Sequence, residues 1–407
     1  MTEWYNERFT MRVYFDYNAT SPLAPEVADA VGSALREVFG NASSVHHFGQ
    51  QAKALLDEAR SAVADLIGGD PSELVFTSGG TEADNFAIRG AAAVFEAQGP
   101  SLGSASVKRH LIASAIEHEA VLNTLKALAR RGWRTTLLAV DQSGVLSPDR
   151  LKDAITDDTA VVSVMHANNE IGTIQPIAEL ASIAHAHGAL MHTDAVQSVG
   201  KIPVNVGALG VDLLSLSAHK FNGPKGAGAL WIKRGARLQA ILTGGKHERN
   251  RRAGTENVPA IAGMGVAATL AGGKLAAEST RLAALRDRLE NGILSTVPGT
   301  AINGSRASRV PNTTNISFDR IEAESLLIAL DLEGIAVSTG SACSSGTLEP
   351  SHVLRAMGLP VHRTQNSLRF SLGLFSTEKE VDQVVNVLPR LVEKLRGLTR
   401  KPLPVGG

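Results

Sequence analysis

Short apolar runs alternate with helical patterns over the first two thirds of the chain. Residues 49–67, for example, carry apolar side chains every three to four positions, which predicts a helix with one buried face. Alternation of this kind predicts an α/β fold, in which a mostly parallel sheet lies between helices. The predicted strands are 13–16, 73–76, 110–114, 135–139, 160–165, 189–192 and 211–216, and the predicted helices are 25–39, 49–67, 83–98, 120–131, 148–155 and 177–187.

The pattern changes from about residue 258. Two long helical patterns, 258–272 and 278–296, are followed by strand patterns at 314–318 and 335–338. Because 407 residues, 43% of them hydrophobic, exceed what one core usually needs, we expect two domains. The predicted division is a large domain over 13–262 and a smaller α+β domain over 1–12 and 263–407. Further helices are predicted at 322–332 and from the capping box at 377–380 towards 398.

Charge and cysteine content narrow the function classes. The 40 basic and 40 acidic side chains balance, and no basic run contains interleaved aromatic residues, so we expect no nucleic-acid partner. No apolar run was expected to span a bilayer, and the first seven residues lack signal-peptide character, which predicts a cytoplasmic protein without a membrane partner. The single cysteine, Cys343, excludes an internal disulfide and a cysteine-rich metal site. The pairs His46–His47 and His185–His187 lack neighbouring ligands at metal spacing.

Polar loops follow several of the predicted strands, at the sheet edge where α/β proteins bind ligands. The segment 77–82, Thr-Ser-Gly-Gly-Thr-Glu, joins a strand to a helix through a glycine turn. Free backbone N–H groups and the helix dipole there can bind a phosphate, with Thr81 adding a hydroxyl. An ordinary helix cap explains the same residues.

Three further strand ends carry candidate chemistry. His118 can stack on a planar cofactor and exchange protons, or simply cap a helix. Asp194 can pair with a protonated ring nitrogen, as pyridoxal phosphate requires, or act as an N-cap, and Gln197 can hydrogen-bond a ring oxygen. Lys220 ends an apolar run and can form a Schiff base with a carbonyl cofactor, although an isolated lysine there is more often a surface residue.

The lone thiol of Cys343 lies among small residues. Segment 338–350 offers few side chains for a core, so we expect it to be mobile. A thiol on a flexible arm can enter a pocket, take a sulfur atom and carry it away.

Together, these motifs resemble the class V aminotransferase group of fold-type I pyridoxal-phosphate enzymes, and in particular cysteine desulfurases of the IscS/NifS type. The resemblance runs from about residue 14 to 398. It rests on the segments 16–20 (DYNAT), 77–82 (TSGGTE), 117–118 (EH), 168–172 (NNEIG), 194–197 (DAVQ), 217–220 (SAHK) and 252–255 (RAGT), and on the active-loop pattern around Cys343.

The resemblance implies a fold-type I transferase whose Lys220 binds pyridoxal 5'-phosphate. It implies that His118 stacks on the ring, that Asp194 holds its nitrogen and that Gln197 holds its phenolic oxygen. Cofactor contacts are also implied for Gly80, Thr81, Asn169, Ser217, His219 and, from the second subunit of a homodimer, Thr255.

The same resemblance implies how the substrate and sulfur are handled. Arg369 would bind the substrate carboxylate, with Asn169 and Asn18 as further substrate contacts, and Cys343 would be the nucleophile that becomes a persulfide. His118 would handle the substrate thiol proton. Sulfur would pass to an iron–sulfur scaffold or another acceptor protein, and a nascent cluster shared with such a scaffold would make Cys343 a transient metal ligand.

Some positions depart from the family pattern. Lys246 and Asn250 stand where glycine is usual, so the loop 243–255 is expected to be reshaped, while the intact Gly254–Thr255 favours a preserved cofactor site. The basic residues of this loop suggest either an anion site or, as the favoured interpretation, a solvated rim. Ser344 follows the cysteine where threonine is common, which is a mild change.

The predicted function is desulfuration of L-cysteine to L-alanine, with a persulfide on Cys343. A selenocysteine lyase is an alternative with the same chemistry. A class V aminotransferase is a second alternative, which the cysteine arm disfavours. A non-catalytic adaptor is a third, which the intact Lys220 disfavours.

Overall fold

Seven strands form the central sheet of the computed structural model, which describes residues 12–98, 108–340 and 350–398. The strand order is β2-β8-β7-β6-β5-β3-β4, and only β8 runs antiparallel to its neighbours. The strands are β2 (Leu74–Thr77), β3 (His110–Ser114), β4 (Arg134–Leu138), β5 (Thr159–Ser163), β6 (Leu190–Asp194), β7 (Leu213–Ser217) and β8 (Gly228–Ile232). The predicted mostly parallel α/β sheet is thus confirmed, and β8 is a strand that the sequence reading did not name.

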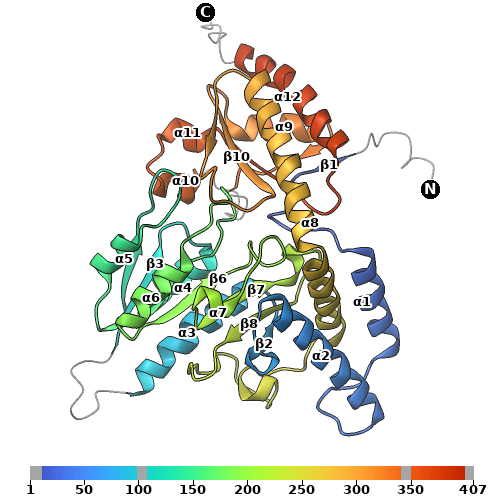
Figure 1. Cartoon of the computed structure of the whole chain (residues 1–407), viewed down its shortest axis with the longest axis vertical. Coiled ribbons are helices and arrows are strands. Elements are labelled where there is room, and N and C mark those ends of the chain that lie inside the picture. Colours follow the sequence, from blue (N-terminus) through green and yellow to red (C-terminus); the bar gives the residue numbers. More distant parts are fainter. Residues whose placement is uncertain (1–11, 99–107, 341–349, 399–407) are drawn as a thin grey trace, which may run out of the picture.

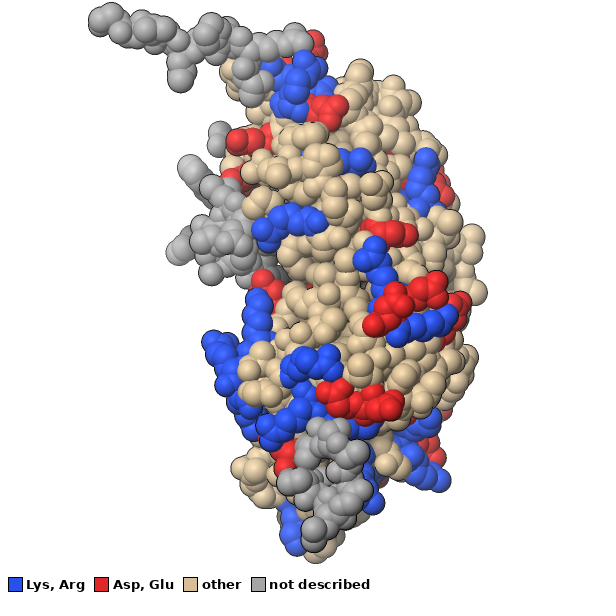
Figure 2. Space-filling model, turned by 90° about the vertical axis from the view of Figure 1, so that its left-hand side faces the viewer, with Lys and Arg blue, Asp and Glu red and all other residues tan. Residues whose placement is uncertain are grey.

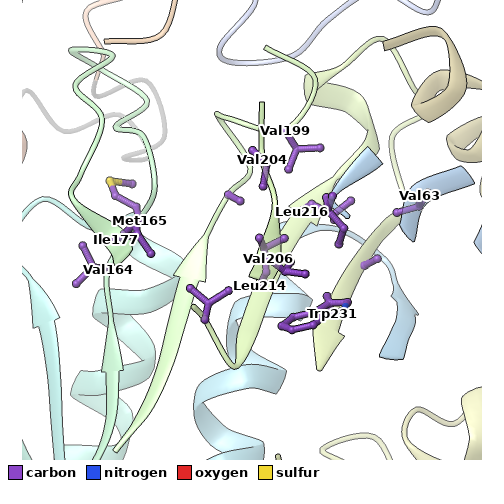
Figure 3. Close-up of a cluster of buried hydrophobic side chains, with 14 of the residues drawn as sticks. Val63, Val164, Met165, Ile177, Val199, Val204, Val206, Leu214, Leu216 and Trp231 are labelled. Atoms are coloured by element: carbon purple, nitrogen blue, oxygen red, sulfur yellow. The ribbon is translucent and has the colours of Figure 1, made fainter. Parts of the chain in front are cut away.

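Helices cover both faces of this sheet (Figure 1). One core cluster lies between the sheet and the helices that include α2 and α8, and Figure 3 shows part of it, with Val63 of α2 near Leu216 of β7 and Trp231 of β8. The helices of this part are α1 (Pro25–Glu37), α2 (His47–Leu66), α3 (Gly80–Gln98), α4 (Glu119–Ala129), α5 (Pro148–Ala154), α6 (Ile177–Ala186) and α7 (Val206–Leu209).

The C-terminal part has its own sheet and its own core. Its antiparallel sheet has the order β12-β10-β9, and β1 (Val13–Tyr14) pairs in parallel with β11 (Ile335–Ala336), so the start of the described chain packs against this second core. The remaining elements are β9 (Thr300–Asn303), β10 (Thr313–Phe318), β12 (Ser367–Ser371), α9 (Ala323–Leu332), α10 (His352–Ala356), α11 (Val361–Gln365) and α12 (Glu378–Leu398).

A single helix, α8 (Val258–Thr296), connects the two parts (Figure 1). The two helices predicted at 258–272 and 278–296 are therefore one. Its first half belongs to the core beside the large sheet and its second half to the C-terminal core. The helix passes through residue 262, so the predicted domain boundary falls inside it, and the division into two domains stays a prediction.

The apolar character of α8 corrects one expectation. By length and composition α8 is able to cross a membrane, with a mean hydropathy of 1.4 in its most apolar window, 44% of which is buried in the molecule. Core helices pass the same test, and the packing of α8 against α1 and α2 accounts for its apolar residues. On the face shown in Figure 2, basic side chains are interspersed with acidic ones, in keeping with the balanced charge.

Candidate active site

Lys220 lies just after β7, in the short 3-10 turn η2 (Ala218–Lys220). Its Nζ donates to the backbone oxygens of Asn18, at 2.5 Å, and Ala19, at 2.8 Å. The neighbouring His219 shares a hydrogen bond of 3.1 Å with the hydroxyl of Thr20. The N-terminal segment 16–20 therefore lies directly over the end of β7.

Asp194 is the last residue of β6, and His118 follows β3 as the residue before α4. His118 Nδ1 accepts from the Ala120 N–H at 3.1 Å and so caps α4. Asp194 Oδ1 accepts from the Val196 N–H at 2.9 Å within a turn, and because no helix begins there, the N-cap alternative for Asp194 is wrong. Burial raises the pKa of Asp194, and the charges of His118 and Lys220 oppose that shift. Burial likewise lowers the pKa of His118, against the charge of Asp194. The three groups thus lie within electrostatic reach of one another.

The predicted phosphate-binding turn lies beside these groups. Gly80 begins α3, and a Cβ on it would come within 2.8 Å of Val196 Cγ2 and 3.7 Å of Ser217 Cβ. The close approach favours a small residue at position 80, and it shows that the turn, the segment after Asp194 and the end of β7 lie together. Thr81, at the start of the same helix, is exposed.

Asn18 is a buried bridge between the two parts of the chain. Its Nδ2 donates to Thr313 Oγ1 at 2.8 Å and to the backbone oxygen of Asn169 at 3.1 Å. Its Oδ1 accepts from Asn312 Nδ2 at 3.1 Å and from Lys201 Nζ at 3.0 Å. Because both amide hydrogens and both lone pairs are used, the side chain positions other groups, and its predicted role as a substrate contact stays a prediction.

Gln197 is also buried, and its two amide atoms have different partners. Its Nε2 donates to the backbone oxygen of Asn18 at 3.0 Å, and its Oε1 accepts from Lys201 Nζ at 2.6 Å. Lys201 is a residue that the sequence reasoning missed. The available signal was a lysine four residues after Gln197, in the otherwise small or apolar segment 198–202.

Arg369, on β12, is 3% exposed and points towards the same region. Its Nη1 donates to the backbone oxygen of Asn169 at 3.0 Å, and its Nη2 donates to Asp16 Oδ1 at 2.5 Å. Its Nε is buried and has no hydrogen-bond partner within the described part of the chain. A buried N–H donor of this kind is suited to a carboxylate ligand.

The loop 243–255 is held by ion pairs and shows how the chain accommodates Asn250. Asn250 has a φ of 64°, a left-handed conformation that asparagine tolerates better than most residues, whereas Lys246 is not among the positive-φ residues. Arg252 pairs with Glu82 at 2.8 Å, at the start of α3. Thr255 is exposed, and no described contact brings it to Lys220 within this chain.

Two other arginines of this loop have protein partners as well. Arg249 and Arg251 both donate to the backbone oxygen of Ser72, at 2.9 and 3.4 Å. The rim interpretation is therefore favoured over an anion site, with the loop tied to the chain before β2.

Two buried carboxyl groups near Asp194 were also missed. Glu117 Oε1 accepts from the Met165 N–H at 2.8 Å and from the hydroxyl of Ser114, and burial raises the pKa of Glu117 to about 8. Burial and the charge of Asp194 raise the pKa of Asp84 as well. The signal for Glu117 was its position beside His118 at a strand end.

The residues present fit pyridoxal phosphate. A lysine amine, a buried carboxyl group and a glycine at the start of a helix suit the aldehyde, the ring nitrogen and the phosphate of this cofactor. Across residues 12–98, 108–340 and 350–398 no group of three His, Cys, Asp or Glu side chains is placed to hold a metal ion. Cys343, with its predicted roles, lies outside the described residues.

Comparison with known proteins places the chain in a family. The model of the class V aminotransferases matches residues 13–384. The chain belongs to this family. It is 49% identical to the cysteine desulfurase IscS of Dictyoglomus turgidum, over 95% of the chain and 96% of that protein. It is 48% identical to the cysteine desulfurase IscS of Methanosarcina thermophila, over 95% of the chain and 93% of that protein.

Solved structures agree with this placement. A NifS-like protein, 37% identical, superposes with a TM-score of 0.87 over 95% of this chain and 100% of the other. SspA, solved in complex with cysteine and 33% identical, superposes with a TM-score of 0.78 over 90% of this chain and 100% of the other. The predicted resemblance to IscS/NifS enzymes and the predicted fold class are confirmed.

Proposed function

We propose that the protein is a pyridoxal-phosphate-dependent cysteine desulfurase, which converts L-cysteine to L-alanine and retains the sulfur as a persulfide. The observation that carries the proposal is the grouping of Lys220, Asp194 and His118 at one end of the sheet. The arginine Nε buried above this group supports it, as do relatives that are named cysteine desulfurases and are nearly half identical over almost the whole chain.

The cofactor would be held by residues from both sides of the sheet edge. Lys220 would bind its aldehyde carbon, Asp194 its ring nitrogen and Gln197 its phenolic oxygen, while the backbone at Gly80 would bind the phosphate. When bound, pyridoxal phosphate withdraws electrons from the substrate Cα and so makes its proton acidic. Ser217, His219, Thr81 and the partner's Thr255 complete the proposed phosphate contacts, and Asn169 is proposed to contact both ring and substrate.

This chain's own residues would do the remaining chemistry. Arg369 would orient L-cysteine through its carboxylate, with the buried Nε as the added donor. The amine of Lys220 would move the Cα proton, and His118, kept neutral by burial, would accept the proton of the substrate thiol. The Cys343 thiolate would then attack the substrate sulfur, so that the S–S bond forms as the C–S bond breaks. The electron pair of the C–S bond would stay on the substrate Cβ, and the proton held by His118 would return to that carbon to complete alanine.

The partners follow from this chemistry. We propose a homodimer, as the resemblance to cysteine desulfurases implies, in which the exposed Thr255 contributes to the phosphate site of the partner subunit. The persulfide would pass to an iron–sulfur scaffold or another acceptor protein in the cytoplasm, with Cys343 as a transient cluster ligand in the scaffold case.

The test is the production of alanine and sulfide from L-cysteine in the presence of a thiol reductant. Wild type should be yellow and active, Cys343→Ser should keep the colour and lose activity on L-cysteine, and Lys220→Ala should lose activity. A wild-type protein without the chromophore, or a fully active Cys343→Ser variant, contradicts the proposal. Poor activity of wild type on L-cysteine but high activity on L-selenocysteine would identify a selenocysteine lyase instead.

A further inference from the structure

Lys201 is a second buried lysine beside Lys220. It is 8% exposed and lines the same cavity as Lys220, together with Tyr17 and Asn312. Within the described part of the chain, the hydrogen bonds of its Nζ go to two amide oxygens, Gln197 Oε1 and Asn18 Oδ1. Buried lysines are rare, because moving an ammonium group out of water is costly, so this position calls for a reason.

The hydrogen bonds from Lys201 Nζ determine the orientation of the Gln197 and Asn18 side-chain amides. The oxygen and nitrogen of an amide occupy similar space, and hydrogen-bond partners determine their orientation. Because Lys201 donates to both side chains, Gln197 and Asn18 turn their oxygens towards it and their NH2 groups away.

Those NH2 groups face the groups that would do the chemistry. Gln197 Nε2 donates to the backbone oxygen of Asn18, which also accepts from Lys220 Nζ. Asn18 Nδ2 donates to the backbone oxygen of Asn169, which also accepts from Arg369 Nη1. One amine thus holds two amides that share their acceptors with Lys220 and with Arg369.

Gln197 has a further hydrogen available. An amide NH2 carries two N–H donors, and one of them is used for the backbone oxygen of Asn18. The second can reach a ligand only while Nε2, rather than Oε1, faces the site.

We propose that Lys201 is a positioning residue, which holds Gln197 with an N–H directed at the phenolic oxygen of pyridoxal phosphate. This inference rests on the proposed function. A donor to that oxygen stabilises its anionic form and therefore lowers the pH at which the bound chromophore loses its proton. A positive charge on Lys201 acts in the same direction.

The surrounding charges support a tuned electrostatic role. Burial lowers the pKa of Lys201 well below its usual range, and the charges of Lys220 and Arg369 lower it further. Burial also lowers the pKa of His219 to about 4, with a contribution from Lys201.

The experiment is a pH titration of the absorbance of the cofactor-loaded enzyme. Lys201→Met should raise the pH midpoint of the absorbance change by on the order of one unit. Lys225→Met is the matched control, because Lys225 is exposed and its charge also acts on His219, so its removal takes away a nearby charge without touching either amide. Its midpoint should stay close to that of wild type.

A double-variant cycle separates positioning from general destabilisation. In a Gln197→Ala background, Lys201→Met should shift the midpoint by clearly less than it does alone, because the amide that it orients is gone. If Lys201→Met does not fold, Lys201→Gln, which is shorter and uncharged, should raise the midpoint in the same direction. An unchanged midpoint in the folded, cofactor-loaded Lys201 variant overturns the inference, as does an equal shift with and without Gln197.

Failure of the proposed function looks different. A wild-type protein that binds no pyridoxal phosphate, or makes no alanine from L-cysteine, refutes the function itself. An active, yellow wild type with an unmoved midpoint in the Lys201 variants refutes only the role of Lys201.

Discussion

The ion pair between Arg60 and Glu248 should be among the most costly to break in this molecule. Arg60 donates to both carboxylate oxygens of Glu248, at 2.7 and 2.8 Å, and the two side chains are 8% and 3% exposed. Glu248 also accepts from the Phe76 N–H at 2.9 Å, while Arg60 donates to the Leu74 carbonyl at 2.9 Å. The pair therefore ties the loop after residue 243 to α2 and β2.

The loop it holds has an unfavourable backbone. Glu248, Arg249 and Asn250 are consecutive non-glycine residues with φ of 45°, 57° and 64°. Each left-handed residue costs about 1 kcal/mol or more, so surrounding contacts must hold the conformation. Arg60→Met would leave the Glu248 carboxylate buried with its backbone donor alone, and we expect a loss of about 3–5 kcal/mol in the free energy of unfolding.

Urea unfolding of single and double variants measures this loss in the free energy of unfolding. The pair Arg60→Met and Glu248→Gln should cost less together than the sum of the separate losses, because the double variant leaves no unpaired buried charge. Lys53→Met is the control on the same helix, since the Lys53–Asp57 pair is about half exposed and should change stability by roughly 0.5 kcal/mol at most. A loss below about 1 kcal/mol for Arg60→Met, or simple additivity, would refute the reasoning.

Three further outcomes are expected. Burial raises the pKa of Glu117 to about 8 from its usual 4.5, so the stabilisation by its protonated form is present below pH 4.5 and is lost as the pH rises to about 8. Between pH 5 and 7 the free energy of unfolding should therefore fall by about 1.4 kcal/mol per pH unit on account of this group. Glu117→Gln should remove that pH dependence. Asn250→Ala should unfold about 1 kcal/mol more easily than Asn250→Gly, because alanine tolerates the left-handed backbone poorly; equal stabilities would contradict this. Arg369→Lys should raise the KM for L-cysteine about tenfold or more while kcat changes less, because lysine cannot keep the contacts with Asn169 and Asp16 and also supply the free Nε donor. An unchanged KM in steady-state alanine assays would exclude the contact.

Most strands of the large sheet before residue 217 could be predicted because they are apolar runs that end in a polar turn. The exception is the edge strand β4, which contains two threonines and an exposed Leu137. The same logic was available for β8, whose five residues are all buried. The position of β8 in the sheet cannot be predicted from its own residues. The chain turns back after Lys220, and β8 lies antiparallel between β2 and β7. An apolar run shows that a segment is buried but not which neighbours it pairs with.

Helix α8 is continuous because tertiary packing stabilises it, which helix patterns in the sequence do not reveal. Gly272 and Gly273 lie where the first predicted helix, 258–272, ends. Each glycine costs a helix only about 1 kcal/mol, and the burial of both halves, each in its own core, outweighs that cost.

Site residues divide in the same way. Lys220, Asp194 and His118 could be proposed from the sequence because each has a chemical use for a cofactor and follows an apolar run, and their catalytic roles stay predictions. Lys201 had no such signal, because a lysine is normally assigned to the surface and its partner Asn18 lies 183 residues away. Side chains that position other side chains are recognisable only once the fold brings them together. A bridge such as Lys201 between Gln197 and Asn18 is therefore where a structure adds most to a function already suggested by sequence.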